Sequence, residues 1–122
     1  MNYTIELNQK NKTIEVKAAC LLDQGIRKKI LLAVSRRLET SGFSRVLIDL
    51  TESTFNPSEM MTGALELTDY LRSIGIKPHV KFAFIYSDAE SHRKYFENVA
   101  QSFGFNIQYF KRRNEAIAWL HL

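Results

Sequence analysis

Few side chains of this sequence could carry out chemistry, and they lie far apart along the chain. The sequence has one cysteine, Cys20, which cannot close an internal disulfide or build a zinc site alone. His79 falls in an expected loop and His121 near the chain end, so neither has partners for a metal site. The sequence also lacks a glycine-rich phosphate loop and a G-x-S-x-G motif. We therefore expect no catalytic residues, no bound metal and no cofactor.

Two polar residues lie where open α/β sheets bind ligands, at the carboxyl ends of strands. Asp49 ends the apolar run 45–50, and His92 follows the apolar run 80–86. His92 is a candidate for a ligand or partner face, although a histidine on an apolar helical stripe near a helix cap more often has a structural role. For Asp49 we expect hydrogen bonds to backbone amides of the following loop. Cys20 has apolar neighbours, which predict a buried, unreactive thiol.

The pattern of apolar residues predicts how these side chains are positioned. Period-two alternation in 3–7 and 13–17 indicates an antiparallel hairpin. Strands and helices then alternate, which is typical of a parallel sheet covered by helices. We expect helix caps at Asp23 and Asn114, and helix ends at Gly42, Gly75 and Gly104. The predicted fold is α/β, with a mixed five-stranded sheet, an N-terminal antiparallel hairpin and about four covering helices.

Length and composition are those of one globular domain spanning residues 1–122. No apolar run approaches the length of a membrane span, and we expect a cytoplasmic protein. The formal net charge is +4, and the first 50 residues hold nine basic and five acidic side chains. Because aromatic residues are not interleaved with these charges, we expect no nucleic-acid binding.

The second predicted helix, from about 57 to 74, is apolar over an unusually wide arc. At 100° per residue the arc covers about 220°, whereas a single core-facing stripe needs roughly 100°. Another element of the chain, a partner subunit, a ligand or a membrane surface could cover the excess. The candidate ligand or partner face is therefore drawn mainly from this helix: Met60, Met61, Leu67, Tyr70 and Ile74.

The order of elements and several local motifs resemble the SpoIIAA-like group of STAS domains, also described as STAS/Sec14-like. The hairpin, RVLIDLTESTFNPSE, VKFAFIY and the closing NEAIAWL carry the resemblance, which covers essentially the whole chain. It implies a non-enzymatic domain that binds a regulatory protein partner. Sec14-like relatives imply the alternative, a small apolar or lipid ligand, with peripheral membrane contact. A homodimer also remains open.

The resemblance assigns Ser58 to the position of the serine that a partner kinase phosphorylates in anti-sigma-factor antagonists. In this sequence Pro57 replaces the acidic residue before that serine, and Glu59 replaces the small residue after it. An ordinary role in the first helical turn is the alternative for Ser58.

We predict that Ser58 is not a working phosphorylation switch, because the residues on both sides depart from the motif. Mass spectrometry of the protein isolated from its own cells should find Ser58 unmodified. Stoichiometric phosphate on Ser58 would contradict this prediction.

Overall fold

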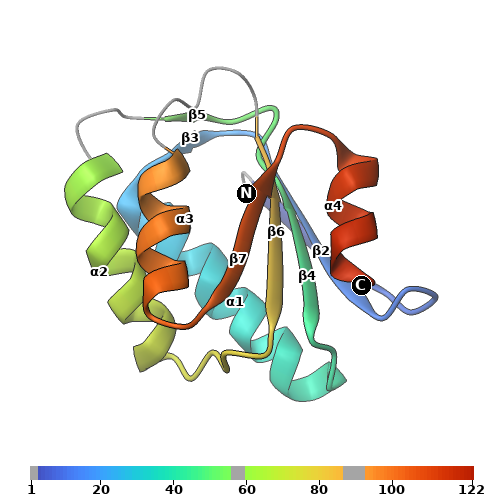
Figure 1. Ribbon diagram of the computed structural model, residues 1–122. Coiled ribbons are helices and arrows are strands. Elements are labelled where there is room, and N and C mark those ends of the chain that lie inside the picture. The colour runs from blue at the N-terminus through green and yellow to red at the C-terminus, as the bar shows by residue number, and fades with distance from the viewer. Residues whose placement is uncertain (1–2, 56–59, 87–92) are drawn as a thin grey trace.

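The computed structural model describes residues 3–55, 60–86 and 93–122. Within them, five strands form one sheet in the order β1-β2-β4-β6-β7 (Figure 1). Strand β1 pairs antiparallel with β2, and the other neighbours are parallel. This confirms the predicted mixed sheet with an N-terminal hairpin. The strands are β1 (Tyr3–Asn8), β2 (Thr13–Ala18), β4 (Arg45–Asp49), β6 (Lys81–Ile85) and β7 (Asn106–Phe110).

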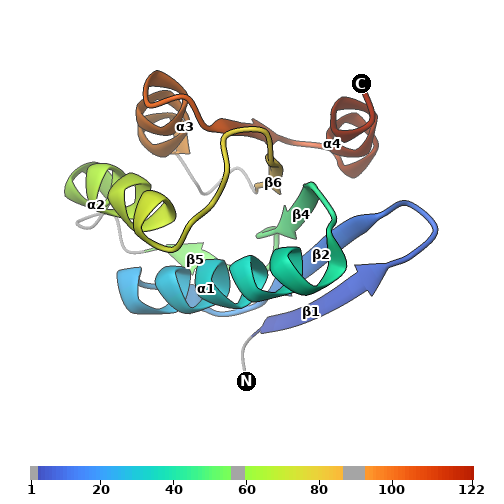
Figure 2. The same cartoon turned by 90° about the horizontal axis from the view of Figure 1, so that it is seen from below.

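Four helices of the described residues cover the sheet, as the sequence predicted. Helices α1 (Gln24–Ser41), α2 (Met60–Ser73) and α3 (Arg93–Ser102) lie on one side, and α4 (Arg113–Leu120) lies on the other (Figure 2). The Asp23 carboxylate caps α1 by accepting a hydrogen bond from the Ile26 amide at 2.8 Å. Gly42 ends α1 with φ +72°, a left-handed conformation that glycine adopts without strain. Both predicted ends of α1 are therefore confirmed.

The predicted cap of the last helix is wrong by two residues. Arg112 is the N-cap of α4, and Asn114 lies inside the first turn. No side chain caps this end by a hydrogen bond. Instead, Ala116 and Leu120 are both fully buried against the sheet. Their packing fixes the position of the helix more strongly than the capping preference of Asn114 does.

A second, two-stranded sheet was not predicted. Strands β3 (Leu21–Leu22) and β5 (Thr54–Phe55) pair in parallel, with Leu22 opposite Phe55. Two residues are too few to show a period-two pattern, so sequence alone could not distinguish them from loop. This pair lies at the end of the molecule where the parallel strands finish (Figure 1).

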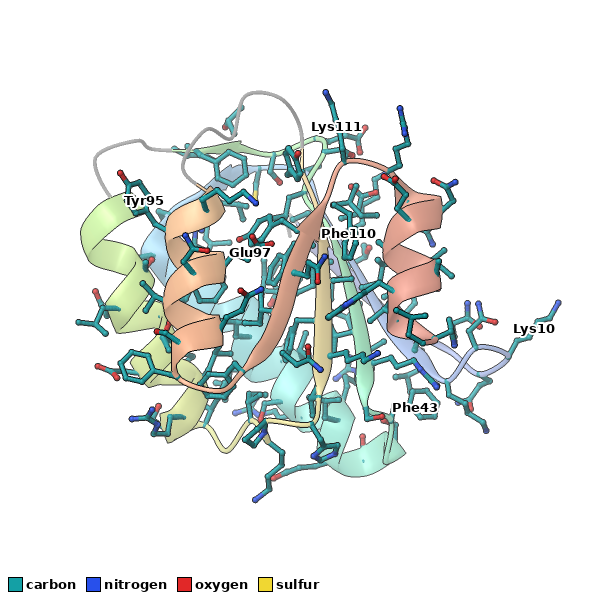
Figure 3. The ribbon with its side chains drawn as sticks, in the orientation of Figure 1. Lys10, Phe43, Tyr95, Glu97, Phe110 and Lys111 are labelled. Atoms are coloured by element: carbon teal, nitrogen blue, oxygen red, sulfur yellow. The ribbon has the colours of Figure 1, made fainter. Side chains whose placement is uncertain are left out.

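The core has two layers because apolar side chains leave both faces of the central strands. The larger layer lies under α1, α2 and α3 and includes Val46, Ile48, Phe82 and Phe84. The smaller layer lies under α4 and includes Leu47, Ala83 and Ile85. Phe110 points from β7 toward α4 (Figure 3).

The C-terminal end of α4 is tied to the amino ends of two strands. Arg45 Nε donates to the Leu120 carbonyl at 2.9 Å, and Lys81 Nζ donates to the Trp119 carbonyl at 3.1 Å. Positive side chains at this end satisfy the last helical carbonyls and complement the helix dipole. Leu120 is fully buried, whereas the Trp119 ring is only half-buried, between Phe110 and Lys81.

Replacing Leu120 by alanine should therefore destabilise the protein more than replacing Trp119. Full burial of Leu120 predicts a loss of about 2–5 kcal/mol for Leu120→Ala. For Trp119→Ala we expect about 1–3 kcal/mol, because the ring keeps part of its solvent contact. Urea denaturation of both variants measures the two values. The reverse ranking would show that α4 is anchored mainly through its tryptophan.

Candidate functional site

A turn around Asp49 follows directly on the carboxyl end of β4. Asp49 Oδ1 accepts hydrogen bonds from the Thr51 amide at 2.9 Å and from Thr51 Oγ1 at 2.6 Å. The expected bond from Asp49 to a loop amide is therefore confirmed. Since this oxygen accepts both hydrogen bonds of the turn, Asp49 stabilises the turn at the end of β4.

The loop that follows this turn is fastened to the end of β2. Ser53 is buried, and its hydroxyl donates to the Ala18 carbonyl at 2.8 Å. The Thr54 amide donates to the Cys20 carbonyl at 2.9 Å. Lys17 and Glu52 form an exposed ion pair at 3.0 Å, and the hydrogen bond and charge of Glu52 raise the pKa of Lys17. These contacts place β5 beside β3.

The β3–β5 pair presents an apolar and cationic surface. Leu21 is 53% exposed, whereas its neighbour Leu22 points inward and is buried. The Arg27 guanidinium lies 5.2 Å from the centre of the half-buried Phe55 ring, a cation–π distance. We call the set Leu21, Arg27, Thr54 and Phe55 the β3–β5 surface. Aromatic residues and arginine are enriched in protein-binding surfaces, and Leu21 adds exposed apolar area beside them.

Beneath this surface is an apolar cavity of about 30 Å³. That volume is close to the share of one water molecule in the liquid, whereas pockets for small molecules measure about 300–1,000 Å³. It lies among the carboxyl ends of the strands and residues of α1, α2 and α3. Its lining includes Leu22, Arg27, Leu50, Leu67, Phe84 and Tyr109.

Two larger grooves are open and more polar. One of about 390 Å³ lies at the other end of the molecule, between the end of α1 and the segment before β6, and is lined in part by Phe43 and His79. The other, of about 250 Å³, lies beside the start of α4 and is lined by Glu15, Lys17 and Arg113 among others. Arg113 pairs with Glu15 at 2.7 Å, so these charges already neutralise each other.

The predicted face on the second helix is only partly present as a surface. Leu67 is 4% exposed and packs in the core, so it is not available for a surface contact. Tyr70 and Ile74 are half-buried beside α1: Lys28 Nζ lies 5.5 Å from the Tyr70 ring centre, and Ser35 Oγ donates to the Ile74 carbonyl at 3.2 Å. Ser58, His92 and the side chains of Met60 and Met61 lie outside the described residues.

The wide apolar arc of α2 has a cause within the chain. Helix α2 lies between α1 and α3, so it has a neighbour on each side as well as the core (Figure 2). The Arg72 guanidinium over the Phe103 ring marks the α3 side, at 5.2 Å. In the described part of α2, Leu65 is the large apolar side chain that stays exposed, at 51%. An outside partner is therefore not needed to explain the arc.

The surface residues that sequence reasoning missed are Leu21, Arg27 and Phe55. The only sequence signal was the short apolar group that ends directly before the helix cap Asp23.

In the described ranges, no three histidine, cysteine, aspartate or glutamate residues gather as a metal site. Likewise, none of the described helices has the length and apolar character needed to cross a membrane.

This arrangement, a mixed sheet that begins with a hairpin and is covered by helices on both faces, defines the class of the protein. The SpoIIAA-like family model matches residues 13–121, and the chain belongs to that family. No curated protein sequence matches it significantly.

Two solved structures share the fold. The anti-sigma factor antagonist SpoIIAA in its unphosphorylated form has 15% sequence identity and a TM-score of 0.56, with 98% of this chain and 97% of that chain covered. An uncharacterised protein from Shewanella loihica PV-4 with a SpoIIAA-like fold has 19% identity and a TM-score of 0.54, with 97% and 91% covered.

The environment of Cys20 predicts low reactivity. The thiol is half-buried, and burial, followed by the Asp23 carboxylate, raises its pKa. Because the thiolate is the reactive form, iodoacetamide should modify Cys20 at pH 7.5 more slowly in the folded protein than in urea. A modification rate in the folded protein equal to the rate in urea would show that the fold does not protect the Cys20 thiol.

Proposed function

We propose that this domain is non-enzymatic and regulates a protein partner by binding it through the β3–β5 surface. The observation that carries the proposal is the exposed Leu21 beside the Arg27–Phe55 pair. Family membership supports it, since the solved relative SpoIIAA is named as an antagonist of an anti-sigma factor.

The β3–β5 surface has the features of a binding site for a preformed partner surface. Two hydrogen bonds fasten β5 to the strand ends, so its backbone is held before binding. Arg27 rests on Phe55, which limits the number of orientations that its guanidinium can take. A surface ordered in advance loses less conformational entropy when a partner binds.

The size of the apolar cavity favours a protein partner over the alternative, an apolar or lipid ligand. A cavity of about 30 Å³ is far smaller than a pocket that holds a small molecule. Its walls are core residues such as Ile48 and Phe84, which would have to move apart to admit a ligand. The groove of about 390 Å³ has the size of a ligand pocket, but it is open and more polar than the cavity, so it suits an apolar ligand poorly. We therefore assign binding to the surface above the cavity.

Affinity capture with matched variants tests this proposal. The wild-type protein, Leu21→Glu and Leu65→Glu are each immobilised and exposed to lysate of the native cell. Both leucines are about half exposed, at 53% and 51%, so both variants should fold. We expect a protein retained by the wild type and by Leu65→Glu to be reduced at least about tenfold with Leu21→Glu, as for a residue central to an interface.

Circular dichroism and urea midpoints provide the folding control for both variants. Retention by Leu21→Glu at the wild-type level would contradict the β3–β5 surface. Loss with Leu65→Glu alone would move the binding face to the outer side of α2.

A further inference from the structure

The two edge strands of the main sheet, β1 and β7, differ in whether other groups of the chain cover their outer backbone groups. At the β7 edge, the buried Glu97 of α3 accepts a hydrogen bond from the Tyr109 amide at 2.6 Å. Gln101, one turn further along α3, donates to the Ile107 carbonyl at 2.8 Å. Figure 3 shows Glu97 between α3 and β7. Side chains of α3 therefore occupy backbone groups that another strand would need for pairing.

The β1 edge has no comparable cover in the described residues. Strand β1 is the outermost strand beside β2 (Figure 2). It pairs with β2, and the hydrogen bonds of the Asn8 side chain stay within the hairpin. Its six residues pair with β2 in continuous register, without a bulge. They include no proline. A bulge and a proline are two devices with which proteins block an edge, and β1 has neither; its one charged side chain is the exposed Glu6.

The side chains of β1 alternate in a way that suits a strand partner. Tyr3 and Ile5 pack on the margin of the core, and Leu7 beyond them is 37% exposed. Thr4 and Glu6 point to the opposite face and are exposed. A strand added to β1 would extend a half-covered apolar row on one face and a polar row on the other.

We propose that β1 pairs antiparallel with β1 of a second copy of this chain, about a two-fold axis at Ile5. This register places Tyr3 opposite Leu7 of the second copy and Ile5 opposite its equivalent. On the other face, Thr4 lies opposite Glu6. Every facing pair is apolar with apolar or neutral with charged, so the strand is complementary to itself.

Registers shifted toward the hairpin turn are poorer. An axis at Glu6 would place two glutamates directly opposite each other, which is unfavourable. An axis at Leu7 would pair Ile5 with a residue of the hairpin turn, so less of the strand would overlap. Because a strand pair buries little area, the dimer should be weak and should form with rising concentration.

Disulfide trapping tests the position of the axis. In a Cys20→Ala background, Ile5→Cys is the single thiol and lies on the axis. Facing residues of antiparallel strands have Cα atoms about 4.5–5.5 Å apart, within the range of a disulfide. Leu7→Cys is the matched control, since the two copies of residue 7 would lie roughly 14 Å apart along the strands, beyond disulfide reach.

Under mild oxidation we expect a covalent dimer from Ile5→Cys and none from Leu7→Cys alone. An equimolar mixture of Leu7→Cys and Tyr3→Cys should form a mixed dimer, because those residues face each other. Cross-linking of Leu7→Cys to itself, or none at Ile5→Cys in folded protein, would overturn the proposal.

A second set of variants avoids the core margin. Thr4→Glu places two glutamate pairs opposite each other, and sedimentation equilibrium should show dimerisation weakened roughly 2- to 30-fold at low salt. Adding Glu6→Lys turns both repulsive pairs into attractive ones, so the double variant should associate at least as tightly as the wild type. A wild-type protein that stays monomeric up to about 1 mM, or a double variant no tighter than Thr4→Glu, would overturn the proposal.

Discussion

The burial of β4 and β6 on both faces is the constraint from which the rest of the structure follows. Their side chains are apolar in both directions, so neither face of the central sheet can meet water. Three helices cover one face and α4 covers the other. Arg45 and Lys81, at the amino ends of these strands, then fasten the end of α4. Once both faces are covered, the strand ends and the sheet edges are left as surfaces for binding.

The structure uses these remaining surfaces in different ways. At the carboxyl ends of the strands, the polar groups of Asp49 and Ser53 form hydrogen bonds that hold the loop between β4 and β5. The exposed Leu21 of the β3–β5 surface lies at the same end of the sheet. The β7 edge is occupied by Glu97 and Gln101. In the described residues, the β1 edge has no such cover, and its side chains alternate between an apolar and a polar face. We therefore propose two distinct contact regions on this domain: the β3–β5 surface for a different protein and the β1 edge for a second copy of the chain.

Features decided by neighbours in sequence could be predicted. The alternation in 3–7 and 13–17 identified the hairpin, and Asp23 and Gly42 marked the ends of α1, because these signals depend on a few adjacent residues. Asn114 failed as a cap because the docking of Ala116 and Leu120, which depends on distant strands, outweighed its local preference.

The candidate site could be predicted less well, for a related reason. The wide apolar arc of α2 was visible in the sequence, but which elements cover it depends on α1 and α3. Sequence reasoning placed Leu67 on a surface, whereas the arrangement of three helices buries it. The exposure of Leu21 follows from β3, a strand of two residues that pairs with another of two residues. Such a pairing leaves no periodic signal.

Residue-resolved amide exchange by NMR distinguishes the covered β7 edge from the open β1 edge. At low protein concentration, the Tyr109 amide should be protected by Glu97, while alternate amides of β1 should exchange fast. As the concentration rises, the fast β1 amides should gain protection and Tyr109 should not change. Fast exchange of the same β1 amides at every concentration, or protection already complete in dilute solution, would contradict the account.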